Sequence, residues 1–439
     1  MGTILIQNFG PIKEAKIDLG KNFQILIGEQ ASGKSTISKV VYFCQRLRDY
    51  TLDFLLDSRQ FAEYHRNEYF NGYLKYLQRK FMGCFGTTKH MEKFSIIYTF
   101  DRRKIIIKLN ENGYIRYQFD EELKRGINRL LYDAAGIFIS DGKEKEYLSL
   151  IDRLTAMEMM KRQYEQALKE LFCNNMEIIY IPAGRSLLAT LSEQLQELPI
   201  SGIDLTMQEF IKLILRTKNK FGNKMPEIVK DYTNTVKGQI NNASVEKACE
   251  IIKQILRADY ASESDGEKIY FDEHHWVKLM YGSSGQQEAL WILMLAFITI
   301  LENKKTFFVI EEPEAHLFPM AQRNIMDLIS LMINSTNSKA IITTHSPYIL
   351  TSANVLLYSD KVERGYKGKA KNIIPKNMRI SYNDFAAYRV GRTDGFTKDL
   401  TSILEVESHM IQVDYIDKVS TITNEELNNL LEMEAEDGL

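Results

Sequence analysis

The sequence predicts an α/β protein with a mixed, largely parallel core sheet, an antiparallel β-subdomain, a helical insertion and a small C-terminal α+β extension. Three observations lead to this fold class. An apolar strand at 23–28 runs into a glycine-containing turn and then a helix. Residues 306–345 read as strand, helix and strand, the alternation typical of a parallel sheet with helical crossovers. Residues 94–119 hold three short strands around "DRR" and "ENG", which favours an antiparallel unit.

The order of these patterns divides the chain into four segments. Residues 1–186 form a lobe with a glycine-containing loop, and residues 187–264 are a helical insertion. Residues 265–358 begin with a hairpin and continue into the strand–helix–strand pattern. Residues 359–439 form the C-terminal extension, which begins with a basic stretch and ends in an acidic tail.

Composition indicates a large soluble protein. The 439 residues are 44% apolar, enough for a core in more than one lobe, and the formal net charge of −2 favours no charged partner. No CxxC exists among four scattered cysteines, which argues against a zinc hook or a redox pair. The N-terminus does not read as a signal peptide, and the longest apolar run, 289–301, is too short for a bilayer. We therefore expect a cytoplasmic protein without a membrane partner.

A phosphate loop is the clearest motif. The stretch "GEQASGKST" fits G-x-x-x-x-G-K-[ST], follows a strand and opens a helix, which is the context that supports nucleotide binding. Backbone N–H groups and the helix N-terminus would cradle phosphates. Lys34 would reach the β- and γ-phosphates of ATP, and Ser35 would bind Mg²⁺. The expected ATP-binding residues are Gly28, Glu29, Gln30, Ala31, Ser32, Gly33, Lys34, Ser35 and Thr36. The alternative is a glycine-rich turn without a ligand.

Two acids end the apolar strand of "TFFVIEEPEAHLFP". A buried strand rarely carries adjacent carboxylates at its tip, because repulsion and desolvation both cost free energy. Ligands, however, bind at the carboxyl edge of a parallel sheet. Glu311 is therefore predicted as a Mg²⁺ ligand, directly or through water, and Glu312 as the catalytic residue that orients or deprotonates the attacking water. The alternative is a solvated strand end.

A histidine ends the next strand, in "KAIITTHSPYIL". One helix separates this strand from the acidic one, so His345 is expected beside the acids, where it could bond the γ-phosphate and sense hydrolysis. The alternative is a structural histidine.

Small polar residues precede the apolar run "LWILMLAFITIL", in "YGSSGQQEAL" (281–290). With the phosphate loop, the acidic strand and the histidine, this order resembles the ATP-binding-cassette (ABC) ATPases, whose signature LSGGQ is similar to "GSSGQQ". The resemblance implies that Ser283 and Gly285 contact the γ-phosphate of ATP bound to another subunit, and that Ser284 and Gln286 belong to the same site. It implies a homodimer that sandwiches two ATP molecules, with a higher oligomer as an extension. A plain helix N-cap is the alternative.

The stretch "EEPEAHLFP", followed by "THSPYIL", resembles the corresponding motifs of the OLD-family ATPases and, more distantly, those of the RecF, Rad50 and SMC group. "IYIPAGRSLL" and "NDFAAYRVGRTDG" are similar to the same set, and the Septu and retron-associated ATPases of anti-phage systems fit best. Transporter cassettes usually carry Asp at the position of Glu311 and need a membrane partner. The resemblance therefore implies an ATPase of bacterial defence, and a RecF-like DNA-binding repair or replication ATPase is the alternative.

Departures from the family pattern are informative. Gln30 and Ala31 replace the usual Asn-Gly, and Ser284 replaces a signature glycine. The resemblance also implies a Q-loop residue, usually a glutamine that links Mg²⁺ to the helical lobe. This residue is not evident, and Gln118 and Arg185 are the candidates. The residues after His345 lack the clustered acids of a Toprim nuclease, and the dispersed histidines form no HNH-like cluster. A nuclease or toxin effector is therefore expected on a separate chain.

Two stretches are candidates for nucleic-acid contact. Residues 64–81 interleave aromatic and basic side chains, as single-strand binders do, but they also fit an amphipathic helix packing its aromatics on the core. The basic stretch 361–379 could touch phosphates or an acidic partner, or be a solvated loop.

Overall fold

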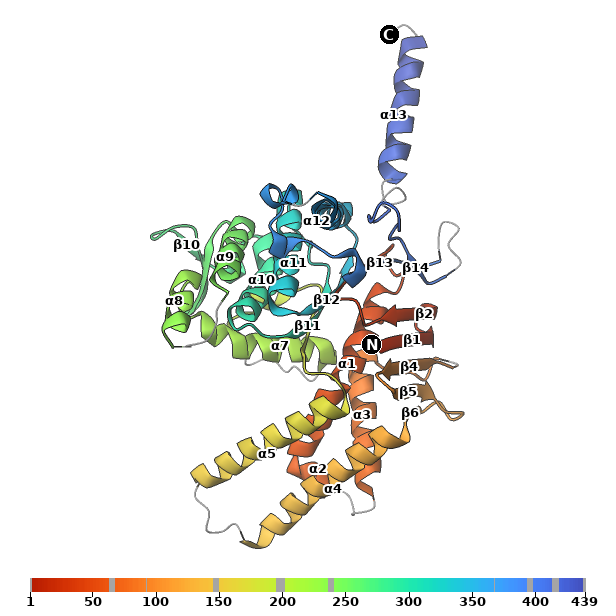
Figure 1. Ribbon diagram of the computed structural model, residues 1–439, viewed down its shortest axis with the longest axis vertical. Helices are drawn as coiled ribbons and strands as arrows, with labels where there is room; N and C mark the ends of the chain where they lie inside the picture. The colour runs from red at the N-terminus through yellow and green to blue at the C-terminus, as the bar shows by residue number, and fades with distance from the viewer. Residues whose placement is uncertain are drawn as a thin grey trace.

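The computed structural model describes residues 2–62, 68–91, 93–144, 150–194, 202–235, 241–366, 368–392, 398–412 and 418–436. Its helices surround two larger sheets, and one helix extends from the body at the C-terminal end (Figure 1). The strands are β1 (Gly2–Phe9), β2 (Ile12–Asp18), β3 (Phe23–Ile27), β4 (Ser95–Phe100), β5 (Arg103–Leu109), β6 (Ile115–Phe119), β7 (Glu177–Ile181), β8 (Asp259–Glu263), β9 (Gly266–Tyr270), β10 (Trp276–Lys278), β11 (Thr306–Glu311), β12 (Lys339–Thr344), β13 (Phe385–Val390) and β14 (Leu400–Ser402). The α-helices are α1 (Lys34–Leu56), α2 (Ser58–Ala62), α3 (Tyr69–Phe85), α4 (Glu121–Glu144), α5 (Leu150–Leu171), α6 (Ser186–Thr190), α7 (Leu205–Thr217), α8 (Met225–Thr235), α9 (Asn242–Leu256), α10 (Ser284–Leu301), α11 (Pro319–Thr336), α12 (Pro347–Gly365) and α13 (Lys418–Glu436).

The central sheet has six strands in the order β14-β13-β3-β12-β11-β7. Every neighbouring pair is parallel except β13 with β14. All residues of β3 and β11 are buried, as expected for strands covered on both faces. The carboxyl ends of the five parallel strands therefore lie at one edge of this sheet.

The two faces of the central sheet pack against different partners. One face, with Phe23 and Ile25, shares a core with helices α9 to α12. The other, with Leu26 and Val309, shares a core with α1 and the antiparallel sheet β2-β1-β4-β5-β6. In β4, half-buried and buried residues alternate, because only one face of the antiparallel sheet packs on a core. A third, three-stranded sheet has the order β10-β9-β8.

Helix α10 runs through the core next to α9 and α11. Its residues from Gln287 to Leu301 are all buried, so it is apolar around its full circumference. By length and composition it could cross a membrane, but 83% of it is buried inside the protein. We therefore treat α10 as a core helix.

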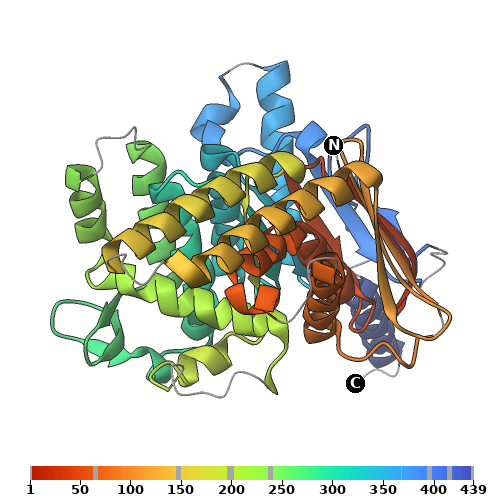
Figure 2. The same ribbon diagram turned by 90° about the horizontal axis from the view of Figure 1, so that it is seen from below.

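The predicted fold class is confirmed in its main parts. The strands at 94–119 form β4 to β6, the 187–264 insertion contains α7 to α9, and the hairpin before α10 is β9 with β10. Helices α4 and α5 run side by side away from the sheets (Figure 2). The sequence did not predict that β13, from the C-terminal extension, lies parallel to β3 in the central sheet. The central sheet therefore combines strands from three of the four predicted segments, namely 1–186, 265–358 and 359–439.

Candidate nucleotide site

The central sheet brings the predicted site residues together at its carboxyl edge. The phosphate loop follows β3, Glu311 ends β11 with Glu312 directly after it, and His345 follows β12. Strand β12 lies between β3 and β11, which explains how three distant stretches of sequence reach one place. The structure thus supports the predicted placement of Lys34, while the role of each residue stays a prediction.

The glycines of the phosphate loop are required by space as well as by conformation. A Cβ atom on Gly28 would lie 2.3 Å from the carbonyl oxygen of Val390 in β13. Gly33 caps α1 with φ 103°, and a Cβ there would lie 2.5 Å from Ile12. The loop is therefore packed between β13 and the β1–β2 hairpin, and the helix starts without a side-chain cap on its N–H groups.

The Lys34 side chain is held inside the loop. Its ammonium group donates to the carbonyl oxygens of Gly28 at 2.9 Å and Glu29 at 2.8 Å. Burial lowers the pKa of Lys34, and the nearby carboxylates of Glu312 and Glu314 oppose this shift. These hydrogen bonds keep the charge at the mouth of the loop, where a phosphate would be bound.

Glu311 lies under the loop. Its side chain is buried and accepts from the hydroxyl of Ser38 at 3.3 Å and from the backbone N–H of Ala183 at 3.4 Å. Ser38 belongs to the first turns of α1 and also donates to the carbonyl oxygen of Ser35 at 3.1 Å. Glu311 is therefore held close to the start of α1, where Ser35 is the predicted second Mg²⁺ ligand.

Glu312 and His345 face each other across the site. The His345 Nε2 atom lies 3.5 Å from a Glu312 carboxylate oxygen, and both side chains are 39% exposed. Glu312 has φ 43°, an uncommon value for a residue other than glycine. Burial lowers the pKa of His345, the charge of Lys34 lowers it further, and the Glu312 carboxylate opposes both. The pair is thus accessible to solvent, unlike Glu311.

A third acid of the "EEPE" stretch was given no role in the sequence analysis. Glu314 is buried, and it accepts from the Thr344 hydroxyl at 2.6 Å and from the His345 backbone N–H at 2.8 Å. Burial raises the pKa of Glu314. Glu314 therefore fixes the end of β12. The sequence feature that could have indicated this role is a third carboxylate close to the end of a buried strand.

A buried ion pair connects the acidic strand with α10. Arg185 is fully buried, and its Nε atom lies 3.3 Å from the carboxylate of Glu288, which is 2% exposed. The guanidinium also donates to the backbone carbonyl oxygens of Pro182, Glu288, Glu311 and Glu312 at 2.6–2.9 Å. Arg185 thus fixes the backbone of the acidic pair, and sequence reasoning missed its partner.

Of the two Q-loop candidates, Gln118 is wrong by position. It lies in β6, the edge strand of the antiparallel sheet, where it pairs with Ile106. Arg185 instead follows β7, directly beside β11. Its role as the Q-loop residue stays a prediction.

The signature-like residues form the start of α10. The Ser283 hydroxyl caps the helix by accepting from the Gln286 N–H, and the Gln286 side chain accepts from the Ser283 N–H, which makes a capping box. A Cβ on Gly285 would lie 2.9 Å from the carbonyl oxygen of His316. The N-cap, which was the alternative interpretation, is therefore present, while the contact with the ATP of a second subunit stays a prediction. Ser284 and Gly285 line a groove of about 1070 Å³.

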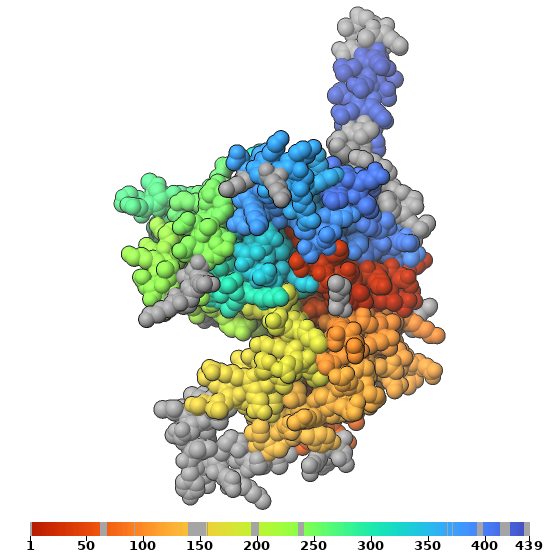
Figure 3. All heavy atoms as spheres, in the orientation of Figure 1, coloured from red at the N-terminus to blue at the C-terminus, as the bar shows by residue number. Residues whose placement is uncertain are grey.

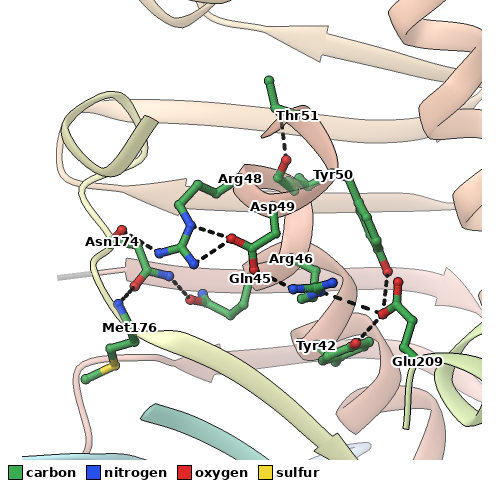
Figure 4. A network of polar contacts seen from close by, with 11 residues as sticks. Tyr42, Gln45, Arg46, Arg48, Asp49, Tyr50, Thr51, Asn174, Met176 and Glu209 are labelled. Carbon is green, nitrogen blue, oxygen red and sulfur yellow. Dashed lines mark hydrogen bonds and ion pairs between the residues drawn. The ribbon is translucent and has the colours of Figure 1, made fainter. Parts of the chain in front are cut away.

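A polar network positions helix α1 behind the loop (Figure 4). Glu209 of α7 accepts from the hydroxyls of Tyr42 and Tyr50, and it lies 3.7 Å from the Arg46 guanidinium. On the other side of α1, Arg48 donates to the Asn174 carbonyl oxygen at 2.8 Å. The helix that begins at the phosphate loop is thus tied to the helical insertion and to the approach to β7.

The stretch considered for nucleic-acid contact packs its aromatic residues inward. In α3, the rings of Tyr69, Tyr73 and Phe81 are buried. Residues 64–67 lie outside the described residues, while 68–81 form a helix start and α3. The amphipathic-helix interpretation therefore fits this stretch better than stacking on single-stranded nucleic acid.

Comparison with known proteins gives a family. A family model described as "AAA ATPase domain" matches residues 1–182 and 177–350. A comparison with curated proteins gave no match. Three solved structures are similar at low identity and low TM-score, and likenesses this weak assign neither activity nor partner. They are an SMC head bound to the C-winged helix domain of ScpA (12% identity, covering 93% of this chain and 99% of that one, TM-score 0.42), the SMC head domain from Thermotoga maritima (10%, 92% and 98%, 0.37) and the Smc head domain with an extended coiled coil bound to the C-terminal domain of ScpA derived from Pyrococcus furiosus (15%, 97% and 100%, 0.39). Because the family model covers most of the sequence and the site has the phosphate loop of an ATPase, the chain belongs to the AAA ATPase domain family.

Proposed function

We propose that the protein hydrolyses ATP with Mg²⁺, closes into a homodimer around two ATP molecules, and thereby controls a separate nuclease or toxin in bacterial anti-phage defence. One observation carries the hydrolytic part of this proposal. The phosphate loop, the acidic pair and His345 converge at the carboxyl edge of β3, β11 and β12. The convergence provides a cation for phosphates and a carboxylate for water in one place.

The residues present fit ATP and Mg²⁺. Uncapped N–H groups at the start of α1 and the Lys34 ammonium suit phosphate oxygens. The Ser35 hydroxyl and the Glu311 carboxylate are hard oxygen ligands, which Mg²⁺ prefers. When bound, Mg²⁺ neutralises charge on the β- and γ-phosphates. Lys34 would exchange its contacts with the loop carbonyl oxygens for phosphate oxygens.

Glu312 is the residue we assign to water. Its exposed carboxylate accepts a hydrogen bond from the water that attacks the γ-phosphorus. The new P–O bond forms as the bond to the β–γ bridging oxygen breaks, and the proton of the water passes toward Glu312. His345, whose pKa is lowered, is available as a neutral donor to the γ-phosphate. The Arg185 guanidinium donates to the backbone carbonyl oxygen of Glu312 and so holds this residue in place.

The dimer and the effector rest on further observations. Ser283 and Gly285 lie at a helix N-terminus, which suits the γ-phosphate of a second subunit. The effector on another chain rests on the sequence, because the residues after His345 lack the clustered acids of a Toprim nuclease and the histidines are dispersed. The defence role rests on the resemblance of "EEPEAHLFP" and "THSPYIL" to the OLD-type sequences. A cytoplasmic location is proposed from the four scattered cysteines, which fit a reducing compartment.

The test uses Glu312→Gln and light scattering with and without ATP and Mg²⁺. We expect the variant to lose hydrolysis and to double its mass from 50.9 kDa when ATP is added. Lys34→Ala should lose ATP binding and remain at its starting mass. Normal hydrolysis by Glu312→Gln would show that the assignment of Glu312 is wrong.

The RecF-like alternative now depends on the basic stretch 361–379. Salt-sensitive, ATP-dependent binding of DNA by the isolated protein would favour it over effector control. Absence of such binding would count against the RecF-like alternative.

A further inference from the structure

The end of strand β13 lies against the phosphate loop. Figure 3 shows the surface of the C-terminal extension (blue) next to that of the N-terminal segment (red), and β13 pairs with β3, the strand that runs into the loop. A Cβ on Gly28 would lie 2.3 Å from the carbonyl oxygen of Val390. A Cβ on Gly391 would lie 3.1 Å from the Cβ of Ser32. Residues Val390 and Gly391 therefore form one wall of the phosphate loop, which we call the β13 wall.

The turn between β1 and β2 forms a second wall. A Cβ on Gly33 would lie 2.5 Å from the Cδ1 atom of Ile12 and 3.1 Å from the Cγ atom of Pro11. Gly33 also has φ 103°, a conformation that favours glycine. Pro11 and Ile12, which we call the hairpin wall, thus contact the phosphate loop where α1 begins.

One carboxylate joins the two walls. Asp399 directly precedes β14, and its side chain is 4% exposed. One of its oxygens accepts from the backbone N–H groups of Lys13 at 2.7 Å and Glu14 at 2.6 Å, which directly follow the hairpin wall. The other oxygen accepts at 2.6 Å from the guanidinium of Arg392, which directly follows the β13 wall. The N–H of Gly391 donates to the Asp399 carbonyl oxygen at 2.9 Å.

These contacts suit a joint between two distant parts of the chain. Hydrogen bonds to an ionised carboxylate are roughly twice as strong as those between neutral groups. The Asp399 side chain is buried, so salt screens its charge only weakly. At this contact Glu14 and Asp399 are 385 residues apart, and the intervening chain does not fix their distance locally. The carboxylate is therefore the direct link between the hairpin wall and the β13 wall.

We propose that Asp399 is a positioning residue for ATP binding. It acts through the two walls, which it holds at the separation that keeps the phosphate loop in its binding conformation. Shape matters here because a phosphate loop holds its ligand largely through backbone N–H groups. The inference rests on the proposed function, since it takes this loop as the ATP site. The C-terminal extension thereby sets the affinity of a loop that belongs to the N-terminal segment.

Asp399→Asn tests this role in the full chain. The amide keeps the shape of the side chain but offers one oxygen to the two N–H groups and the guanidinium. We expect the Kd for ATP with Mg²⁺, measured by calorimetric titration, to rise at least about tenfold, which corresponds to ~1.4 kcal/mol. The KM of hydrolysis should rise in parallel while kcat stays within about twofold, because Glu312 is left in place. A merely structural role would lower kcat through the folded fraction and leave KM unchanged.

The matched control is Asp120→Asn, next to the far edge of the antiparallel sheet. Asp120 follows β6 and also accepts from two backbone N–H groups, those of Lys104 at 2.8 Å and Leu123 at 2.9 Å. Its replacement removes the same kind of contact and should lower the midpoint of urea unfolding. The Kd for ATP and the KM should stay within about twofold of the wild-type values.

A second variant, Arg392→Ala, keeps Asp399 and its two backbone contacts. We expect the Kd for ATP to rise by a smaller factor, about threefold, because the carboxylate loses the guanidinium that holds it on the β13 side. This variant decides the question if Asp399→Asn shows no cooperative urea transition.

Two outcomes would overturn the inference while ATP binding by the wild type stands. Equal affinity in Asp399→Asn, or in Arg392→Ala where the former does not fold, would mean that the walls hold without the carboxylate. An equal rise of the Kd in Asp120→Asn would mean that general destabilisation lowers the affinity. Failure of the wild type itself to bind ATP would instead refute the proposed function, and the inference with it, so the two failures are distinguishable.

Discussion

Replacing Glu288 by Gln tests how the buried ion pair supports the catalytic edge. The variant keeps the shape of the side chain and removes its charge. Arg185 is then left as a fully buried cation without a carboxylate, because its only ion pair among the described residues is with Glu288. Burial alone already lowers the pKa of Arg185, and Glu288 is the largest influence that opposes this.

The expected loss follows from the contacts that remain. Removing one partner of a buried ion pair costs about 3–5 kcal/mol of the free energy of unfolding. Here the guanidinium still donates to four backbone carbonyl oxygens at 2.6–2.9 Å, and glutamine keeps one oxygen as an acceptor. We therefore expect the lower end, ~3 kcal/mol. The kcat of ATP hydrolysis should fall as well, since Arg185 fixes the backbone of Glu311 and Glu312, while the Kd for ATP should change little.

Urea unfolding at pH 7, followed by the fluorescence of the buried Trp291 in α10, measures the loss. The control is Glu302→Gln at the other end of α10, where the carboxylate pairs with Lys220 and Lys304 close to solvent. That change should cost less than about 1 kcal/mol. If Glu288→Gln loses no more stability than Glu302→Gln and keeps its kcat, the coupling we infer is absent.

Three further substitutions give separable results. Gly28→Ala should abolish ATP binding in equilibrium dialysis, because its Cβ would lie 2.3 Å from the carbonyl oxygen of Val390 and displace the phosphate loop. The circular dichroism spectrum should stay unchanged, and an unchanged Kd for ATP would contradict the role of the Gly28–Val390 contact. Gly285→Ala should retain ATP binding but lose the ATP-dependent doubling of mass in the Glu312→Gln background, and persistence of the dimer would count against the signature site. Burial raises the pKa of Asp327 from 3.8 to about 6, so the wild type loses stability as pH rises through this interval. Asp327→Asn should therefore stabilise the protein at pH 8 by on the order of 2 kcal/mol and not at pH 4, and an equal gain at both pH values in urea titrations would refute this cause.

The phosphate loop could be predicted because it is contiguous. One stretch supplies its glycines, its lysine and the helix start, and the sheet only has to hold it. The acidic pair and His345 could be placed beside it, because a strand–helix–strand pattern fixes neighbouring parallel strands.

The buried contacts behind the site could not be predicted in the same way. Arg185 and Glu288 are 103 residues apart, and no local pattern states that they meet. Glu314 read as one more acid in an acidic stretch, since its burial depends on the packing of β12. Strand β13 was hidden because "FAAYRV" is short and mixed in polarity, and its partner is near the other end of the chain.

The position of β13 has a consequence for synthesis of the protein. Strand β3 lies between β12 and β13, so both neighbours of the strand that carries the phosphate loop are made more than 300 residues after it. A chain emerging from the ribosome therefore carries its phosphate loop long before β12 and β13, the two strands that pair with β3, have been synthesised. We expect nascent chains that end before Phe385 to be unable to bind ATP, so that only nearly finished chains acquire this property. Such long-range pairing is also slow to form, which leaves β3 exposed to chaperones during translation.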